Sequence, residues 1–360
     1  MIFDPHRPFN DLPPLPPRQD IETKPVLRKL ASAARTLAEL KGLGTSIPNQ
    51  SMLVNSITLQ EAKSSSEIEN VVTTNDALFR AFTAESGKFD AATKEVLRYR
   101  QALWEGFARL KKTPLSTNLF IHIVQTIKQD ARGIRNLPGT VIGNPASGRI
   151  VYTPPEGESL IRNKLRDLEN FIHGDTPVDP LIKLALIHYQ FEAIHPFFDG
   201  NGRAGRIINI LYLVQTGLLE LPVLYLSRAI IQAKSEYYNL LLGVTGKARW
   251  EPWILFMLDA VEATAAFTRE RILQIRELMD KTMEIAKEKL PSRVYSKELM
   301  ETIFRQPYTK AKFLVEAKIA ERKTAAEYLK ELEKISILKS KKIGKETLYL
   351  NVKLYNLLSK

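Results

Sequence analysis

Apolar residues recur every three to four positions along most of the chain between residues 24 and 290, which is the spacing of amphipathic helices. In the first such segment, 24–42, six apolar residues share one helical face and Gly42 can end the helix. These six are Val26, Leu27, Leu30, Ala34, Leu37 and Leu40. The same spacing returns in 95–112, 118–129, 159–174, 180–195, 205–217, 235–244 and a long charged segment from about Trp253 to Leu290. The pattern predicts a mainly α fold.

One segment inside this helical region has a different pattern. Residues 140–157 read TVIGNPASGRIVYTPPEG, in which β-branched residues flank Asn-Pro and Ser-Gly pairs. We therefore expect a β-hairpin between two helices. Residues 1–20 hold six of the twenty prolines, so this arm should run extended over the surface.

The pattern changes again at Pro291. Three short helical segments, 296–306, 310–318 and 324–338, are followed by two short strands around Ile343-Gly344. This is the layout of a winged helix, in which the third helix would read nucleic acid and residues 339–345 would form the wing.

Composition narrows the class of protein. Hydrophobic residues make up 44% of the 360 positions and charged residues 26%, which is typical of a globular protein with ample core material. No run approaches the 18 or so uncharged apolar residues of a membrane span, and the N-terminus lacks the layout of a signal peptide. The absence of cysteine excludes disulfides, thiolate chemistry and zinc fingers. We expect a cytoplasmic protein with no membrane contact.

Positive charge is concentrated at the C-terminal end. The net charge is +12, and residues 291–360 alone contribute +8, from sixteen Lys and Arg against eight Glu. A basic module on a nearly balanced body suggests a polyanion partner for that module, although a merely solubilising surface explains the charge equally well.

Residues 195–206, HPFFDGNGRAGR, carry the strongest chemical signal. Pro196 prevents the preceding helix from continuing, so His195 should lie at a helix exit, where an imidazole can face a cleft. The turn Gly200-Asn201-Gly202 can align backbone N–H groups into an anion nest. A helix starting at about Arg203 would direct its positive dipole end at the same point.

Three charged side chains complete this segment. Arg203 and Arg206 lie three positions apart on one helical face and suit phosphate oxygens, while Asp199 is a hard oxygen ligand for Mg²⁺. A histidine, a metal carboxylate, an anion nest and two arginines together indicate phosphate-ester chemistry with a general base.

HPFFDGNGRAGR resembles the signature of Fic-domain proteins at every defining position. ARGIRNLPGTVIG (131–143) and YTPP (152–155) resemble the Fic segments that lead into and out of a target-binding flap. SSEIEN (65–70) resembles the inhibitory motif of the family. The resemblance to bacterial Fic adenylyltransferases implies an N-terminal helical region at 1–110, a Fic catalytic core at 111–290 and a winged-helix-like domain at 291–360.

The resemblance also implies an activity, the transfer of AMP from ATP to a Ser, Thr or Tyr hydroxyl of a target protein. His195 would be the general base and Asp199 would hold Mg²⁺. The ATP-binding residues would be Gly200, Asn201, Gly202, Arg203, Ala204, Gly205, Arg206, Tyr237 and Tyr238. Thr245 stands where the family has an Asn, which changes the nucleotide contacts there. The flap residues Thr140, Val141, Ile142, Gly143 and Tyr152 would dock the target by strand addition.

In the same resemblance, Glu69 is the inhibitory residue. Its carboxylate would bind Arg206 in the place of the γ-phosphate oxygens and leave ATP misaligned. Ser65 would support the Glu69 helix against the core, and Asn70 ends the motif.

Several alternatives stay open. His188, Glu192 and His195 fall at i, i+4 and i+7 and with Asp199 could form a metal hydrolase site. Other Fic-type transfers, of phosphate, UMP or phosphocholine, would use the same fold. A DNA-binding regulator with a Fic sensor core would explain the basic residues 291–360. The target protein, its modified residue, a homodimer and removal of AMP are left open by the sequence.

Overall fold

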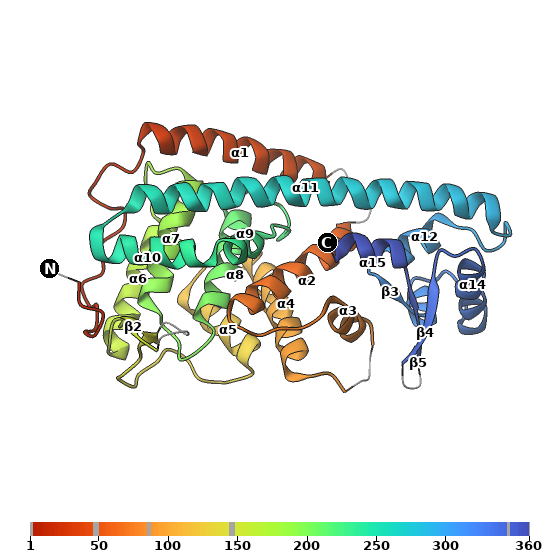
Figure 1. Ribbon diagram of the computed structural model, residues 1–360, viewed down its shortest axis with the longest axis horizontal. Helices are drawn as coiled ribbons and strands as arrows, with labels where there is room; N and C mark the ends of the chain where they lie inside the picture. The colour runs from red at the N-terminus through yellow and green to blue at the C-terminus, as the bar shows by residue number, and fades with distance from the viewer. Residues whose placement is uncertain (1–2, 46–49, 85–87, 144–147, 344–345, 360) are drawn as a thin grey trace.

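The computed structural model describes residues 3–45, 50–84, 88–143, 148–343 and 346–359, and it is an elongated, mainly helical molecule (Figure 1). The N-terminal and central helices are α1 Lys24–Thr45, α2 Gln50–Ile68, α3 Asn75–Thr83, α4 Ala91–Leu110, α5 Thr117–Lys128, α6 Glu158–His173, α7 Pro180–Ile194, α8 Asn201–Gln215, α9 Leu226–Gln232, α10 Lys234–Lys247 and α11 Trp250–Lys289. The hairpin strands are β1 Ile142–Gly143 and β2 Ile150–Tyr152. The predicted mainly α fold with a β-hairpin is confirmed.

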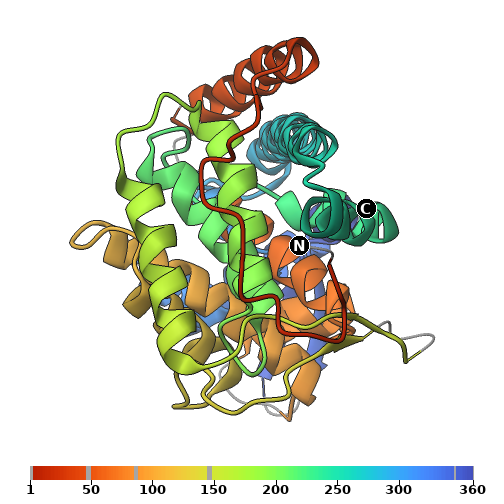
Figure 2. The ribbon, with the colours of Figure 1, turned by 90° about the vertical axis from the view of Figure 1, so that its left-hand side faces the viewer.

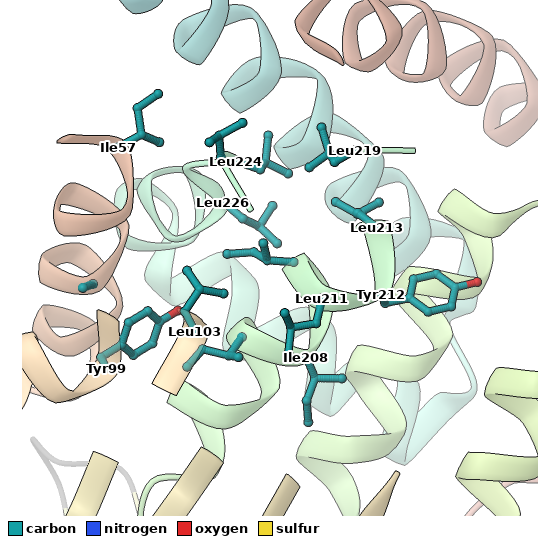
Figure 3. Packing of buried hydrophobic residues seen from close by; sticks show 14 of the residues in the cluster. Ile57, Tyr99, Leu103, Ile208, Leu211, Tyr212, Leu213, Leu219, Leu224 and Leu226 are labelled. Carbon is teal, nitrogen blue, oxygen red and sulfur yellow. The ribbon is translucent and has the colours of Figure 1, made fainter. Parts of the chain in front are cut away.

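Helices α7 and α8 form the centre of the core. Nearly every residue of α7 is buried, and α8 is buried over most of its length, so neither helix has a solvent-exposed face and both must be surrounded by other elements. Figure 3 shows the side chains that surround α8, with Leu211 and Ile208 packed among residues of α2, α4 and α9. Gly106 of α4 lets that helix approach closely, because a Cβ there would collide with Leu211. The candidate site lies where α7 ends and α8 begins.

Helix α11 runs along the whole molecule, and α1 lies beside its first half (Figures 1 and 2). Lys29 of α1 binds Asp259 at 2.5 Å and Glu262 at 3.0 Å across this pair. The predicted start near Trp253 is three residues late. Pro252 lies inside the first turn, where its missing N–H removes no helical hydrogen bond.

The hairpin pairs β1 with β2 in antiparallel register, Ile142 opposite Tyr152, and residues 144–147 at its turn lie outside the described residues. The proline-rich arm runs extended across the base of this hairpin, as predicted (Figure 2). Its Phe9 N–H donates to the Thr153 carbonyl at 2.9 Å, and its aromatic rings pack on Tyr152.

Beyond α11 the chain forms a smaller domain of α12 Lys297–Phe304, β3 Tyr308–Thr309, α13 Ala311–Glu316, α14 Arg322–Lys334, β4 Lys339–Ile343, β5 Glu346–Leu350 and α15 Val352–Leu358. The three predicted helices and the hairpin are present, and the predicted turn at 344–345 lies outside the described residues. The sequence pattern missed β3, which is two residues long and pairs with β5 in an antiparallel sheet of order β3-β5-β4. It also missed α15, which packs back against α11 (Figure 1).

Candidate active site

His195 lies at the exit of α7, as the sequence predicts. Its backbone is left-handed, with φ of 47° and ψ of 60°, and its N–H donates to the Phe191 carbonyl at 3.1 Å. A buried arginine that the sequence analysis missed holds this turn, because Arg135 Nε donates to the His195 carbonyl at 2.7 Å. Arg135 belongs to the segment 131–143 that precedes the flap, so that motif was its only signal. The imidazole is thus placed by a fixed backbone rather than by a free loop.

The imidazole of His195 is neutral across the physiological pH range. Burial, followed by the positive charge of Arg135, lowers its pKa to about 4. Its Nδ1 is buried on the side of the Glu192 backbone, whose hydrogen bond favours a proton on that nitrogen. A neutral imidazole protonated at Nδ1 can accept a proton from an incoming hydroxyl at Nε2.

The anion nest lies directly after this turn. Gly200 adopts φ of 85° and precedes α8, which begins at Asn201, two residues earlier than predicted. The side chain of Asn201 turns back, accepting from the Phe197 N–H and donating to the Phe197 carbonyl, both at 2.8 Å. This pair of bonds shapes the loop and leaves the helix N-terminus without a side-chain cap, which suits anion binding.

Two further residues that the resemblance assigns to ATP binding, Ala204 and Gly205, lie inside α8. The Ala204 N–H donates to the Gly200 carbonyl at 2.9 Å, so this amide is already used within the helix. Gly205 provides room for Glu192, because a Cβ there would collide with the Glu192 carboxylate. Ala204 and Gly205 therefore support the site from inside α8 rather than face a ligand.

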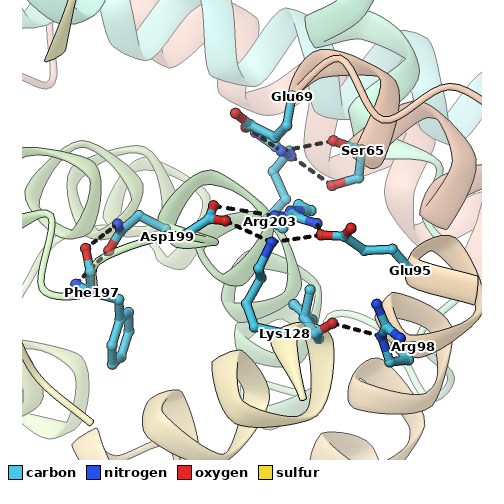
Figure 4. Close-up of polar contacts among 11 residues, drawn as sticks. Ser65, Glu69, Glu95, Arg98, Lys128, Phe197, Asp199 and Arg203 are labelled. Carbon is cyan, nitrogen blue, oxygen red and sulfur yellow. Dashed lines mark hydrogen bonds and ion pairs between the residues drawn. The ribbon is translucent and has the colours of Figure 1, made fainter. Parts of the chain in front are cut away.

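Arg203 and Asp199 belong to a four-residue ionic network (Figure 4). Arg203 donates to Glu95 of α4 and lies 3.4 Å from Asp199. Lys128 of α5 bridges the same two carboxylates, at 2.9 Å from Glu95 and 2.6 Å from Asp199. The sequence analysis missed Glu95 and Lys128, since each lies on an ordinary amphipathic helix with no motif around it.

Glu69 and Arg206 meet over the nest, as the resemblance implies, and Figure 4 shows Glu69 beside Ser65. Arg206 is 1% exposed, and its Nη2 donates to Glu69 Oε1 at 2.8 Å. Its Nε donates to Ser65 Oγ at 2.7 Å, and Nη2 also donates to the Ser65 carbonyl at 2.9 Å. The Glu69 carboxylate packs directly on Gly202, where a Cβ would collide with it. The carboxylate thus lies on the uncapped N-terminus of α8.

The charges in this cluster stabilise each other. Burial alone would raise the pKa of Glu69, but the attraction and hydrogen bond of Arg206 outweigh it and lower that pKa. The Arg206 pKa is raised in turn, since the Glu69 carboxylate overcomes the cost of burying the guanidinium. Asn70, at the end of the motif, adopts φ of 61° just past the end of α2, a left-handed conformation that Asn tolerates better than most residues.

The two tyrosines of α10 lie at different depths. Tyr237 is buried and its hydroxyl shares a hydrogen bond of 2.9 Å with His188 Nε2, so it supports the site from below. Tyr238 is 39% exposed and packs edge-on against Tyr237 at 5.1 Å. Thr245 bonds to the Tyr189 hydroxyl at 3.1 Å and not to the nest.

The metal hydrolase alternative is not supported by the geometry. His188 is turned toward Tyr237 and stacks on Trp253, and burial with the charge of Arg206 lowers its pKa to about 3. No group of three or more His, Asp or Glu side chains arranged to hold a metal ion occurs in the described residues. Glu192 is instead a buried carboxyl whose pKa burial raises to about 7.

Asp199 is the carboxylate that the resemblance assigns to a metal ion bound together with the phosphates. Asp199 is 59% exposed at the mouth of the site, and the ammonium of Lys128 already occupies a cation position on its Oδ2. It lines a cavity of about 220 Å³ with Lys128, Asp130, Phe198 and neighbouring residues. This donor set fits Mg²⁺, which typically takes one or two protein carboxylates and completes its shell with phosphate and water oxygens.

The flap is fixed to the same helix end as His195. The Tyr152 hydroxyl donates to the Ala193 carbonyl at 2.7 Å, and Arg135 donates to the Pro155 carbonyl. Val141 and Gly143 are exposed, while Thr140 and Ile142 are half-buried. The short strand β1 therefore presents an accessible edge at a set position relative to the imidazole.

Three family models match this chain. "Fic/DOC family N-terminal" covers residues 27–108, "Fic/DOC family" covers 114–213, and "Protein adenylyltransferase SoFic-like, C-terminal domain" covers 278–354. The middle match contains His195, the nest and both arginines, and the first contains Ser65 and Glu69. The predicted boundaries at 110 and 290 stay predictions.

Among curated proteins, a probable protein adenylyltransferase of Aquifex aeolicus is 39% identical over 69 residues, which is 19% of this chain and 21% of that protein. Protein adenylyltransferase Fic of Drosophila melanogaster is 32% identical over 111 residues, 31% of this chain and 21% of that protein. Protein adenylyltransferase fic-1 of Caenorhabditis elegans is 27% identical over 121 residues, 32% of this chain and 22% of that protein. The matched segments thus span about a fifth of these relatives.

Solved structures show the fold. A Fic family protein from Desulfovibrio desulfuricans superposes with a TM-score of 0.58 at 18% identity, over 95% of this chain and 98% of that chain. Residues 134–508 of Fic-1 from C. elegans give a TM-score of 0.52 at 17% identity, over 70% of this chain and 74% of that chain. The described residues contain no helix long and apolar enough to span a bilayer.

Proposed function

We propose that this chain, which carries a Fic/DOC domain flanked by a Fic/DOC N-terminal region and a SoFic-like C-terminal domain, is a protein adenylyltransferase that transfers AMP from ATP to a protein hydroxyl. One observation carries the proposal: a neutral imidazole lies beside an uncapped helix N-terminus on which a carboxylate of the chain itself already sits. A site that holds a carboxylate in this way can hold a phosphate oxygen. The names of the relatives support the same activity.

In this reaction His195 takes the proton of a target Ser, Thr or Tyr hydroxyl. The hydroxyl oxygen forms a bond to the α-phosphorus of ATP, the bond to the bridging α–β oxygen breaks, and pyrophosphate leaves. Backbone N–H groups at Gly202 and Arg203, with the guanidiniums of Arg203 and Arg206, would hold the phosphate oxygens. Mg²⁺ held by Asp199 would supply positive charge to the phosphates.

Glu69 would hold the enzyme in an inhibited state. Its carboxylate binds Arg206 over the nest, so a phosphate cannot use the same guanidinium edge while the pair persists. Ser65 adds two further acceptors on Arg206. The exchange of one anion for another at a single buried arginine supports autoinhibition without any larger movement of the fold.

The flap would dock the target by strand addition at β1, a contact made through backbone groups that requires little of the target sequence. Because Arg135 and Tyr152 tie the flap to the end of α7, a segment added at β1 would place its hydroxyl at a set distance from His195.

The test compares ATP labelled at the α-phosphate with ATP labelled at the γ-phosphate, using the purified chain and Glu69→Gly. Adenylylation incorporates only the α-label, and His195→Ala removes it. Incorporation of the γ-label would instead show phosphorylation, and α-labelled UTP in place of ATP tests UMP transfer. Absence of every label from the chain and from a lysate would contradict a transferase.

A DNA contact through residues 291–360 is a second proposal, supported by the exposed side chains of Lys339, Lys341 and Lys342 on β4. Binding to duplex DNA that weakens steeply with salt and is lost on changing these lysines to Gln would support it. Salt-independent or absent binding would favour a protein partner or a solubilising surface. The cytoplasmic location and a homodimer stay predictions.

A further inference from the structure

A second polar cavity, of about 180 Å³, lies away from the nest between α2, α9, α11 and the end of α15. We call it the α2 pocket, and it is lined by twelve residues between Ser56 and Ser359. Figure 1 shows that α15 lies next to one end of α2 and below α11, where the C-terminal domain returns to the larger part of the molecule. The pocket therefore touches the helix that carries Ser65 and Glu69, and also the last helix of the chain.

The wall of the α2 pocket contains several buried polar atoms without partners. Among the described residues, Ser56 Oγ, Gln60 Nε2, Thr268 Oγ1 and Ser359 Oγ make no hydrogen bond, and neither does Asn75 Oδ1. Ser56 and Thr268 are each only 1% exposed. These atoms lie behind the cavity surface rather than on it, so they make this part of the core polar, and contact with an occupant falls to the guanidinium groups of the wall.

Positively charged side chains also line this cavity. The guanidinium of Arg228 lies 4.0 Å from the ring centre of Phe267, and that of Arg271 lies 4.9 Å from it. Arg271 also donates to the Leu357 carbonyl. Because both guanidiniums lie at the same ring, the two cations are close together, and burial and then the like charge of Arg228 lower the pKa of Arg271. Lys63 on the α2 side is paired with Glu67 at 3.5 Å, so the charge offered to an occupant comes chiefly from Arg228 and Arg271.

We propose that the α2 pocket binds a small, multiply charged oxyanion, with phosphate or carboxylate groups, and thereby holds α2 in its docked position. Two guanidinium groups in this arrangement match oxyanion acceptors. The volume is below the roughly 300–1,000 Å³ of pockets for drug-sized ligands, so the occupant is smaller than a nucleotide.

The pocket is connected to the inhibitory contact through α2. Ser56, Gln60 and Lys63 lie on one face of this helix, and Ser65 follows within a turn. Ser64 shares a hydrogen bond of 2.7 Å with Tyr225, which lines the pocket. Glu61 accepts from the Ser227 N–H at 2.9 Å, next to Arg228. An anion that fixes this face also favours the position in which Glu69 meets Arg206, and this regulatory consequence rests on the proposed function.

Binding is tested first, by isothermal titration of the full chain with pyrophosphate and, in a separate arm, citrate, without added metal. We expect at least one arm to bind, and the two arms distinguish phosphate from carboxylate ligands. Arg228→Gln should lower the affinity at least ten-fold, because a charge-assisted hydrogen bond is lost. Arg276→Gln is the matched control, an exposed arginine of α11 outside the pocket, and should bind as wild type.

Two further variants separate the α2 pocket from the nest. Arg206→Ala should retain the Arg228-dependent binding, and Arg271→Gln should weaken it as Arg228→Gln does. The proposal is overturned if neither anion binds, or if binding survives Arg228→Gln and is lost in Arg206→Ala, which would place the anion at the nest. Retained Tm in each variant, measured without ligand, shows that folding is intact.

The link to α2 has its own readout, hydrogen exchange of the amides at 57–68. Saturating anion should slow their exchange in wild type and Arg276→Gln but not in Arg228→Gln. This result does not depend on AMP transfer, so a failure of the proposed function leaves it unchanged. Anion binding without slower exchange would contradict the regulatory role.

Discussion

Replacing Glu69 by Gly should convert the chain into a much faster enzyme. The change removes a carboxylate that is bound to Arg206 at 2.8 Å and packed on Gly202, and leaves the Ser65 contacts of Arg206 in place. Because Glu69 lies just beyond the last residue of α2, the substitution spares the helix interior, where Gly would cost about 1 kcal/mol. The freed guanidinium edge and the uncapped end of α8 then become available to phosphate.

The size of the effect follows from this contact. A hydrogen bond to a charged group contributes about 1.5–3 kcal/mol. If the phosphate of ATP must displace such a bond from Arg206, the affinity for ATP in its reactive position is lowered by roughly ten- to one-hundred-fold. The Glu69 side chain is 33% exposed, so solvent screening moves the expected value toward the lower end. We therefore expect AMP transfer, including self-modification, to rise at least ten-fold in Glu69→Gly.

The assay measures α-label incorporation at subsaturating ATP for four proteins side by side. Glu67→Gly is the matched control, since Glu67 contacts Lys63 at 3.5 Å and has no bond to Arg206. It should stay near wild type. Glu69→Gln keeps the shape and loses the charge, so its rate should lie between wild type and Glu69→Gly.

The double change Glu69→Gly with His195→Ala should be inactive, because inhibition acts on the same reaction. A folded Glu69→Gly protein that binds ATP and transfers AMP no faster than wild type would refute the inhibitory role. An equal gain in Glu67→Gly would show that loosening α2, and not freeing Arg206, is responsible.

Three further predictions follow from the site. His195→Ala should abolish transfer while ATP binding, measured by calorimetry, stays within about three-fold, since the nest and arginines remain; transfer above a few per cent of wild type would exclude His195 as the base. Asp199→Ala should remove the Mg²⁺ dependence of ATP binding, and unchanged metal dependence would mean that Asp199 serves only its ion pairs with Lys128 and Arg203. Burial lowers the pKa of His188 to about 3 in the fold, so below pH 6.5 only the unfolded chain takes up a proton at this residue and the protein becomes less stable. The free energy of unfolding should fall by about 1.4 kcal/mol per pH unit until the pKa of the folded state is approached. Urea unfolding at pH 6.5 and 5 should show a smaller fall in stability for His188→Gln than for wild type, and equal falls would contradict a neutral buried His188.

The backbone conformation of the turn between α7 and α8, residues 195–200, is determined by residues that are neighbours in the sequence. Pro196 ends α7 by removing an N–H, and Gly200 allows the left-handed backbone that starts α8, so both helix boundaries could be placed within two residues from the sequence. Hydrophobic spacing likewise predicted the helices, because the period of side chains on a helix is a local property. The pairing of Glu69 with Arg206 was reached through the resemblance, since no local rule connects residues 137 positions apart.

Only the tertiary structure brought Glu95, Lys128 and Arg135 to the turn. Glu95 and Lys128 come from helices with an unremarkable local pattern, and Arg135 comes from the motif before the flap. Packing of α4, α5 and the flap base against α7 and α8 determines that they meet. The low pKa of His195 depends on the same packing, because burial and the charge of Arg135 both arise from it. The α2 pocket joins residues from Ser56 to Ser359. Backbone sterics act between neighbours and can be predicted from sequence, whereas contacts between distant segments exist only after the core has formed.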